Sequence, residues 1–441
     1  MRLPTRRLML YAAPALPLAA LTLPLYIIVP TFYAETLGVP LAAVGAALLA
    51  VRVFDALNDP LIGALADRWR PAFGRRRTAF ALSLPLTALA AWMLFRPPDG
   101  AGAGYLALWG AVLSLGYTAT LLPFAAWGAE LAGDYRERAR VAAWREGFTL
   151  VGSLAAIAIP FSVGLQRAEG AGDGLGLLGL VVALALPLAG ALTLAAVPEP
   201  REHSVARIGF RAGLAHMRGN GPFLRLMAAY LVNGLANGIP ATLFLYFVSD
   251  RLALPELRGP LLFLYFLSGV AGVPLALAAA GRLGKHRAWA LAMLAACAVF
   301  VWVPAIPPGG LAAFAAVCVL TGLALGFDLS LPAAIQADVI DVDTEASGEQ
   351  RSGVYFAAWS LVTKLSLALG VGIAFPLIGL AGFAAGAGAD NPPGALLALA
   401  ATYAWLPVAL KLVAVALMWR FPLDRAAQTR LRARIEARGR A

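Results

Sequence analysis

The segment from Val51 to Arg77, VRVFDALNDPLIGALADRWRPAFGRRR, places ionisable side chains inside an apolar helix and then enters a dense basic loop. Arg52, Asp55 and Asp59 are spaced by three and four residues, so on a helix their side chains share one side. A charge at the centre of a bilayer costs roughly 2.5–3.5 kcal/mol on insertion scales, so three charges there need a polar cavity or one another. We therefore predict a functional site at these residues.

The composition predicts an integral membrane protein. Of the 441 residues, 61% are hydrophobic and only 13% are charged, whereas an ordinary soluble domain carries about 25% charged residues. An apolar helix that crosses a bilayer needs about 20 residues. We expect an all-α membrane protein with twelve transmembrane helices, at residues 10–33, 41–66, 78–96, 105–129, 142–166, 175–197, 223–248, 258–282, 288–304, 311–335, 352–383 and 395–421.

The net charge is +11, and the positions of the basic residues in the chain indicate what this charge does. Most of them fall in the N-terminus, the C-terminus and alternate loops, which is the positive-inside asymmetry and predicts that both termini are cytoplasmic. This pattern favours a lipid bilayer over nucleic acid as the partner of the basic surface. We expect a functional monomer in a bacterial inner membrane.

A polar segment divides the predicted helices into two sets of six. We expect an N-terminal six-helix bundle at 1–197, a cytoplasmic linker at 198–222, a C-terminal six-helix bundle at 223–421 and a basic cytoplasmic tail at 422–441. The basic loop at 281–287 is a shortened version of the loop at 67–77, and such internal repetition is typical of transporters built from two related bundles.

Asp55 and Asp59 are one helical turn apart, so in a low dielectric they repel each other when both are ionised. A cation between them, or a proton on one of them, relieves the repulsion. Asn58 lies on the same helix and Thr118 on the fourth, and both add neutral oxygens. We predict a site for Na⁺, Li⁺ or H⁺ at these four residues; the alternative is a salt bridge to Arg52 that only locks helix packing.

Three motifs resemble those of one transporter family. Residues 63–68 and 74–77, GALADR and GRRR, resemble the loop between the second and third helices of the major facilitator superfamily. The pattern D-A-x-N-D-P-x-x-G-x-x-x-D-R from Asp55 and the pattern A-D-x-x-D-x-D…G-E-x-R-x-G from Ala337 are similar to those of its glycoside-pentoside-hexuronide:cation symporters. The resemblance implies a major facilitator fold of two six-helix bundles and a cation site at the helix-two aspartates and the helix-four threonine.

Single charged residues within the predicted helices, together with the same resemblance, predict which residues contact the solute. Lys364, one of three lysines, resembles the helix-eleven lysine of these symporters, and we expect it to balance the helix-two carboxylates or to contact solute. Arg145 either binds a solute oxygen or closes a gate with Glu130. We assign no functional role to Lys411. The candidate solute contacts are Arg52, Tyr26, Tyr117, Arg145, Trp359 and Lys364.

The acidic segment from Asp338 to Asp343 lacks the glycine and glutamate of a calcium-binding EF-hand. We expect it to form a loop that pairs with 75–77 or 282–287 and latches one state of the transporter. The predicted gate residues are Asp67, Arg68, Arg75, Glu130, Asp338 and Asp341. The three histidines have no paired ligands nearby in sequence, and no Ser, His and Asp are spaced as in a hydrolase. We therefore expect no enzyme activity, no cofactor and no metal beyond the coupling cation.

The sequence departs from the resemblance where solute specificity is decided. Melibiose-transporting members of the family carry carboxylates on helices one and four that bind sugar hydroxyls, and Ala19 and Leu121 stand at those places here. A galactoside would lose strong hydrogen bonds in such a site. We predict a secondary active transporter that couples Na⁺ or H⁺ to symport of a sugar, glycoside or uronide by alternating access. The alternatives are symport of a lysophospholipid-like amphiphile and, more remotely, a non-transporting membrane sensor or scaffold.

Overall fold

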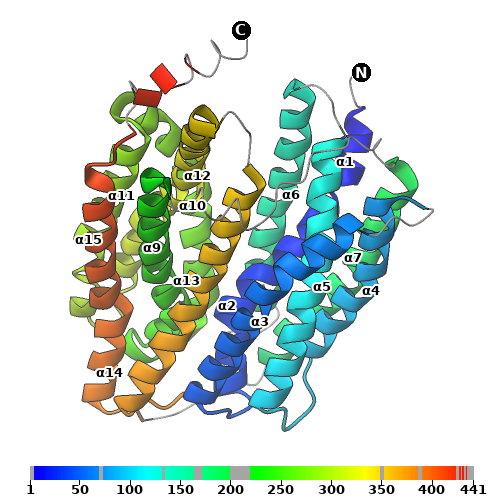
Figure 1. The fold of residues 1–441 in the computed structure, drawn as a ribbon. Coiled ribbons are helices and arrows are strands. Elements are labelled where there is room, and N and C mark those ends of the chain that lie inside the picture. The colour runs from blue at the N-terminus through cyan, green and yellow to red at the C-terminus, as the bar shows by residue number, and fades with distance from the viewer. Residues whose placement is uncertain are drawn as a thin grey trace. The chain divides into compact units, whose positions relative to one another are not determined.

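The structure is a computed structural model that describes residues 4–68, 73–131, 135–162, 171–198, 219–347, 352–385, 390–423, 427–428, 430–431 and 434 (Figure 1). Every regular element in these ranges is helical. The elements are α1 (Thr5–Ala12), α2 (Ala15–Glu35), α3 (Leu41–Arg68), α4 (Arg75–Phe95), α5 (Ala103–Glu130), α6 (Tyr135–Ser162), α7 (Ala171–Ala196), α9 (Gly221–Tyr246), α10 (Arg258–Leu283), α11 (Lys285–Phe300), α12 (Leu311–Ser347), α13 (Ser352–Leu380), α14 (Pro393–Ala400) and α15 (Leu406–Trp419). Short helical turns occupy Phe247–Arg251, Pro255–Leu257, Val303–Ala305 and Ala401–Trp405.

The expectation of an all-α membrane protein is confirmed. Within the described residues, eleven helical segments are long and apolar enough to cross a membrane. The remaining long helix, α6, has 28 residues and matches the predicted fifth span, but Arg145 and Glu146 lie within it. These two charged side chains lower its mean hydropathy relative to the other eleven.

The chain divides into two compact units. Unit 1 comprises Met1–Ser204 with Pro255–Gly259 and Val371–Asn391, and unit 2 comprises Val205–Leu254, Pro260–Gly370 and Pro392–Ala441. In unit 1, α4 packs against α5 and α7, α2 packs against α6, and α3 packs against α5. In unit 2, α9 packs against α15 and α12, and α11 packs against α12 and α15. The residue boundaries predicted for two bundles and a linker stay a prediction, and most of the predicted linker and tail lies outside the described residues.

Close helix packing depends on small residues in both units. A Cβ atom on Gly152 of α6 would collide with the backbone of Leu16 in α2. In unit 2, a Cβ atom on Gly326 of α12 would collide with the backbone of Gly272 in α10. Small side chains let membrane helices approach at backbone distance, so these pairs fix which helices are neighbours.

An aromatic cluster anchors α1 and α5 in unit 1. The rings of Tyr11 and Phe124 stack with their centroids 4.8 Å apart, and Phe80 of α4 stacks on Phe124 at 5.7 Å. The Tyr11 hydroxyl donates a 3.0 Å hydrogen bond to the carbonyl of Phe124. Because Phe124 lies on the same helix as Thr118, this buried cluster helps to hold α5 in place against its neighbours.

The prediction of a loop at Asp338–Asp343 is wrong. Helix α12 continues through these residues to Ser347, so the three aspartates lie on a helix. After Pro332 this helix contains no further proline or glycine, and Ile335 and Val339, one turn apart, are both buried. Apolar residues at helical spacing, with no proline or glycine among them, favour continuation of the helix. Burial of these residues stabilises the helix more than the acidic residues between them destabilise it.

Candidate cation and solute site

Helix α3 presents Arg52, Asp55 and Asp59 on one side, as the spacing predicts. The Arg52 Nη1 atom lies 3.2 Å from Asp55 Oδ2, and the side chains are 9% and 4% exposed. The salt bridge weighed as an alternative is therefore present. It satisfies one carboxylate oxygen of Asp55, and Asp59 is not part of this salt bridge.

Helix α5 supplies hydroxyl groups to both carboxylates. The Thr118 hydroxyl donates a 2.8 Å hydrogen bond to Asp59 Oδ1 and lies 3.5 Å from Asp55 Oδ1. The hydroxyl of Ser114, one turn earlier on α5, donates to the same Oδ1 atom of Asp55. The structure thus brings Asp55, Asp59 and Thr118 together at one point between α3 and α5. Ser114 was not predicted from the sequence, although its spacing of four residues from Thr118 places both on one face.

The charges of this cluster do not balance among themselves. Arg52 carries one positive charge, whereas Asp55 and Asp59 carry two negative charges when ionised. One threonine proton can be donated to only one of the two neighbouring carboxylate oxygens at a time. A monovalent cation bound by these oxygens, or a proton on one carboxylate, would remove the remaining repulsion. The ligand set of carboxylate and hydroxyl oxygens therefore fits a hard cation.

Two tyrosines border the cluster. The Arg52 guanidinium carbon lies 4.2 Å from the centroid of the Tyr26 ring in α2, within the range of a cation–π contact. Tyr117 of α5 lies close enough to Tyr26, Arg52 and Asp55 to interact with them electrostatically. Three of the predicted solute contacts, namely Arg52, Tyr26 and Tyr117, are therefore neighbours in unit 1.

Asn58 has hydrogen-bonding capacity to spare. Its side chain is 8% exposed, and its Nδ2 atom is buried without a hydrogen-bond partner among the described residues. An unpaired buried amide costs free energy comparable to the loss of a hydrogen bond. An amide nitrogen donates and does not bind a cation, so this atom fits an oxygen of a bound solute, and only the Oδ1 atom of Asn58 can be a cation ligand.

The predicted solute residues of unit 2 lie on α13. Trp359 stacks on Tyr230 of α9 with the ring centroids 3.8 Å apart, and the Thr363 hydroxyl donates a 3.1 Å hydrogen bond to the Tyr230 hydroxyl. Lys364, the next residue, is half-buried. Its predicted pairing with the helix-two carboxylates stays a prediction, because those carboxylates belong to unit 1.

A second ionised cluster lies in unit 2, around Asp328 of α12. Its Oδ1 atom accepts hydrogen bonds from Asn233 Nδ2 at 3.0 Å and Trp289 Nε1 at 2.6 Å. Its Oδ2 atom accepts one from Asn237 Nδ2 at 2.9 Å and pairs with Lys411 Nζ at 3.4 Å. Lys411 also donates to Asn233 Oδ1 at 2.7 Å. These five side chains come from α9, α11, α12 and α15.

The cluster around Asp328 was not predicted. Lys411, to which the sequence assigned no site, is largely buried, with its side chain 13% exposed. The available signal was an aspartate in the middle of an apolar helix, together with Asn233 and Asn237 at a spacing of four. Intramembrane ionisable residues are rare, and their rarity alone makes Asp328 and Lys411 candidate partners.

Among the predicted gate residues, the structure describes the side chains of two. Asp338 is buried and its Oδ2 atom lies 2.6 Å from Lys285 Nζ, which belongs to the basic segment 282–287 named as a partner. Asp341 lies one turn further along α12. The side chains of Asp67, Arg68, Arg75 and Glu130 lie outside the described residues. Arg145 forms a 2.7 Å ion pair with its neighbour Glu146.

Long apolar helices in two units, each enclosing ionised side chains, are typical of secondary transporters. The solved structure of a mutant of the nucleoside transporter NupG has the same fold, with a TM-score of 0.69 and 15% identity over 93% of this chain and 99% of that one. The family model for MFS/sugar transport proteins matches residues 10–425.

Two curated relatives span most of the chain. The putative glycoside/cation symporter YagG of Escherichia coli is 25% identical over 77% of this chain and 75% of its own length. The sphingosine-1-phosphate transporter MFSD2B of Mus musculus is 26% identical over 81% of this chain and 77% of its own length. The chain belongs to the MFS/sugar transport family, within the glycoside-pentoside-hexuronide:cation symporters of the major facilitator superfamily, as the motifs predicted. This is a family of transporters and not of enzymes.

Proposed function

We propose that the protein is a secondary active transporter that couples the inward movement of one monovalent cation, Na⁺ or H⁺, to symport of a sugar, glycoside or uronide. The observation that carries the coupling is the pair of carboxylates, Asp55 and Asp59, joined by the hydroxyl of Thr118. Two negative charges beside one arginine take up a cation readily, and a bound cation neutralises the site inside an apolar bundle.

The cycle begins when the cation binds at Asp55 and Asp59. The neutralised carboxylates then leave Arg52 free to turn toward solute from its position over Tyr26. We assign solute contacts to Arg52, Tyr26, Tyr117, Arg145, Trp359 and Lys364, with Asn58 completing the cation site. The loaded carrier reorients by alternating access. Entry of one positive charge across 100 mV contributes about 2.3 kcal/mol to accumulation of solute.

The family resemblance and the ion pair between Asp338 and Lys285 support a gate on the side of the membrane that holds the basic loops. We place this side in the cytoplasm, in a bacterial inner membrane, because the basic loops lie there by the positive-inside rule. Asp67, Arg68, Arg75, Glu130 and Asp341 belong to the same proposed gate.

Uptake into proteoliposomes tests the proposal. Labelled glycosides, uronides, pentoses and a lysophospholipid are each offered under an inward Na⁺ gradient, an inward proton gradient or neither. We expect accumulation of a sugar or glycoside under one of the two gradients, lost in Asp55→Asn and in Asp59→Asn. The matched control is Asp173→Asn, at an aspartate in the first turn of α7 outside the cluster, and it should retain uptake. Accumulation that ignores both gradients would contradict the coupling.

The same uptake experiment also tests the alternative that the solute is a lysophospholipid-like amphiphile. It is favoured by the relative named a sphingosine-1-phosphate transporter and by the absence of carboxylates at Ala19 and Leu121. Accumulation of the lysophospholipid with no accumulation of any sugar would replace the sugar by an amphiphile and leave the cation site unchanged.

A further inference from the structure

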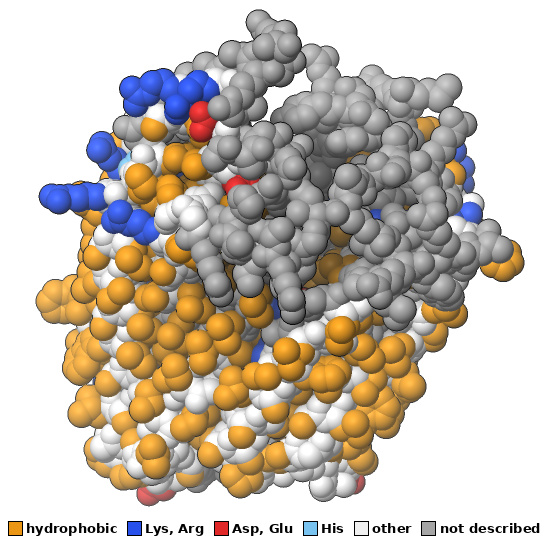
Figure 2. Space-filling model, in the orientation of Figure 1, with side chains coloured by type: hydrophobic (Ala, Val, Ile, Leu, Met, Phe, Trp, Pro, Cys, Tyr) orange, Lys and Arg blue, Asp and Glu red, His pale blue; other side chains and the backbone are white. Residues whose placement is uncertain are grey.

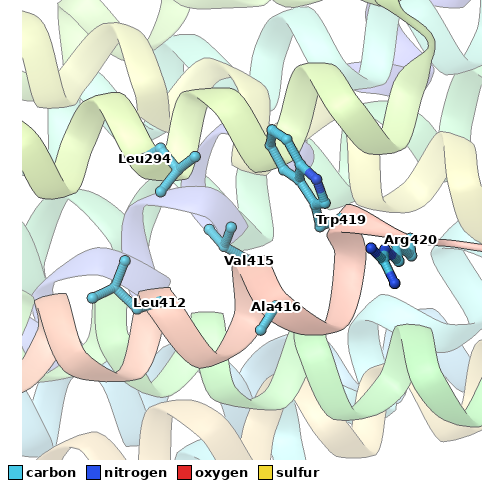
Figure 3. A pocket seen from close by; sticks show the side chains of 6 residues that line it. All are labelled: Leu294, Leu412, Val415, Ala416, Trp419 and Arg420. Atoms are coloured by element: carbon cyan, nitrogen blue, oxygen red, sulfur yellow. The ribbon is translucent and has the colours of Figure 1, made fainter.

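Two adjoining hollows lie at the end of unit 2 where α11 begins and α15 ends. The first is a groove of about 370 Å³ lined by Leu294 of α11 and by Leu412, Val415, Ala416, Trp419 and Arg420 (Figure 3). The second measures about 400 Å³ and is lined by His286, Arg287, Trp419, Arg420 and Phe421. The two hollows share Trp419 and Arg420, so a single elongated molecule can occupy both.

The first hollow has an apolar lining that faces outward. Leu412 and Trp419 are 47% and 48% exposed, and the groove follows two helices that are apolar enough to cross a membrane. Helices α11 and α15 pack against each other, which makes the groove a seam between two spans. A hydrocarbon chain is the chemistry that fills such a seam.

The second hollow is basic. Arg287 and Arg420 are exposed and neither forms an ion pair with any described side chain. Lys285, nearby in sequence, is already paired with Asp338. His286 is buried and packs against Phe421 with the ring centroids 6.1 Å apart, which closes the floor of the hollow. Two guanidinium groups at one opening, without an ion-pair partner among the described side chains, favour an anion, and arginine binds phosphate oxygens in a bidentate fashion.

Trp419 marks the boundary between the two chemistries. It is the last residue of α15 and of the membrane-spanning segment, and Arg420 follows it directly. Tryptophan is enriched at this depth because its ring spans the change from hydrocarbon to headgroup. On the face seen in Figure 2, Lys and Arg side chains gather at this end of unit 2 and hydrophobic side chains cover the surface beyond them.

We propose that these two hollows form a binding site for an anionic membrane phospholipid. One acyl chain lies in the groove along Leu412 and Val415, the glycerol lies beside Trp419, and the phosphate lies between Arg287 and Arg420. A phospholipid fits better than free phosphate because the basic hollow opens into an apolar groove on a membrane-spanning surface. An anionic headgroup fits better than a zwitterionic one because, among the described residues, no acidic side chain lines either hollow to receive a choline or ethanolamine cation.

The site is tested by quenching of tryptophan fluorescence with brominated lipids. The protein is reconstituted into phosphatidylcholine vesicles that contain increasing fractions of phosphatidylglycerol or phosphatidylcholine brominated on the acyl chains. The fluorescence of Trp419 is obtained by subtracting the fluorescence of the Trp419→Phe variant from that of the parent protein. We expect brominated phosphatidylglycerol to quench this signal at a lower fraction than brominated phosphatidylcholine.

The arginines are tested by charge removal. Arg287→Gln should reduce the preference for phosphatidylglycerol about fivefold, because one basic residue near the surface contributes about that factor. Arg287→Gln with Arg420→Gln should abolish the preference. The matched control is Arg282→Gln, at an exposed arginine near the same helix end that lines neither hollow, and it should leave the preference unchanged. Thermal unfolding in detergent confirms that each variant is folded.

Three results would overturn the proposal. Equal quenching by the two lipids would show that the groove holds any membrane lipid without regard to charge. Loss of preference in Arg282→Gln to the same extent as in Arg287→Gln would show a diffuse basic surface in place of a site. Abolition of the preference by inorganic phosphate, compared with chloride at equal ionic strength, would show an anion site that does not need the lipid.

Discussion

Unit 1 and unit 2 each place a largely buried aspartate beside a basic side chain, and the two aspartates differ in the groups that surround them. Asp328 accepts from four donors on three neighbouring helices, which fills the four lone-pair positions of an ionised carboxylate. Asp55 pairs with Arg52 and accepts a hydrogen bond from Ser114, and the Thr118 hydroxyl lies between Asp55 and its neighbour Asp59. The amide nitrogen of Asn58 beside them has no hydrogen-bond partner among the described residues.

The difference separates two uses of charge inside a membrane. The pair of Asp328 and Lys411 is neutral overall and its partners come from α9, α11 and α15, so it joins these helices to α12. Arg52, Asp55 and Asp59 sum to one negative charge when both carboxylates are ionised, which matches the single positive charge of the proposed coupling cation. An intramembrane charge is by default a candidate functional site, and the hydrogen-bond inventory decides which kind.

The largest effect is expected at Asp328. Asp328→Asn removes one partner of a buried ion pair and leaves Lys411 uncompensated, which costs about 3–5 kcal/mol of stability. Thermal unfolding in detergent should show a large decrease in melting temperature. Asp328→Asn combined with Lys411→Met removes both charges and should recover part of the loss. An unchanged melting temperature in Asp328→Asn would mean that the ion pair does not join these helices.

The next largest effect concerns stabilisation by the cation. At a concentration 100 times Kd, a ligand that binds only the folded state adds about 2.7 kcal/mol of stability. We expect NaCl or LiCl, compared with choline chloride at equal ionic strength, to raise the melting temperature of the parent protein and not of Asp59→Asn. If H⁺ is the coupling ion, solute addition should instead drive proton uptake in the parent and not in Asp59→Asn. If the parent protein shows neither the rise in melting temperature nor the proton uptake, the proposed cation site is wrong.

Two of the buried asparagines, Asn233 and Asn58, provide a matched pair. Asn233 donates to Asp328 and accepts from Lys411, so Asn233→Ala leaves both partners short of a hydrogen bond and should cost about 1–3 kcal/mol. Asn58→Ala removes an amide nitrogen that has no partner among the described residues and should change the melting temperature much less. Equal destabilisation by the two variants would mean that Asn58 is as fully paired as Asn233.

The smallest effect is expected at Thr118. Thr118→Val keeps the shape of the side chain and removes the hydroxyl between the two carboxylates. Loss of one such oxygen should weaken cation affinity about tenfold, which corresponds to about 1.4 kcal/mol. Thr118→Ser keeps the hydroxyl and is the control. Titration of the melting temperature with NaCl, or of proton uptake with pH, measures the change, and a Thr118→Val variant with parental affinity would exclude Thr118 as a ligand.

The sequence was sufficient where one helix carries the whole pattern. The spacing of Arg52, Asp55 and Asp59 places them on one side of α3, and the helical repeat alone determines this. The sequence was insufficient for Asp338 to Asp343, because three closely spaced acidic residues predict a loop. Buried Ile335 and Val339 keep that segment helical.

The sequence by itself determined that the chain crosses a membrane repeatedly, and it located the charged helix on which a cation site is proposed. These features depend on local composition and on the period of a single helix. Only the tertiary structure decided that Asp328 and Lys411 form a pair and that Ser114 contacts Asp55. These contacts join different helices, and Asp328 and Lys411 are 83 residues apart in the chain. The physical reason is that hydrogen-bond partners on separate helices are set by how the helices pack, and no period within one helix encodes it.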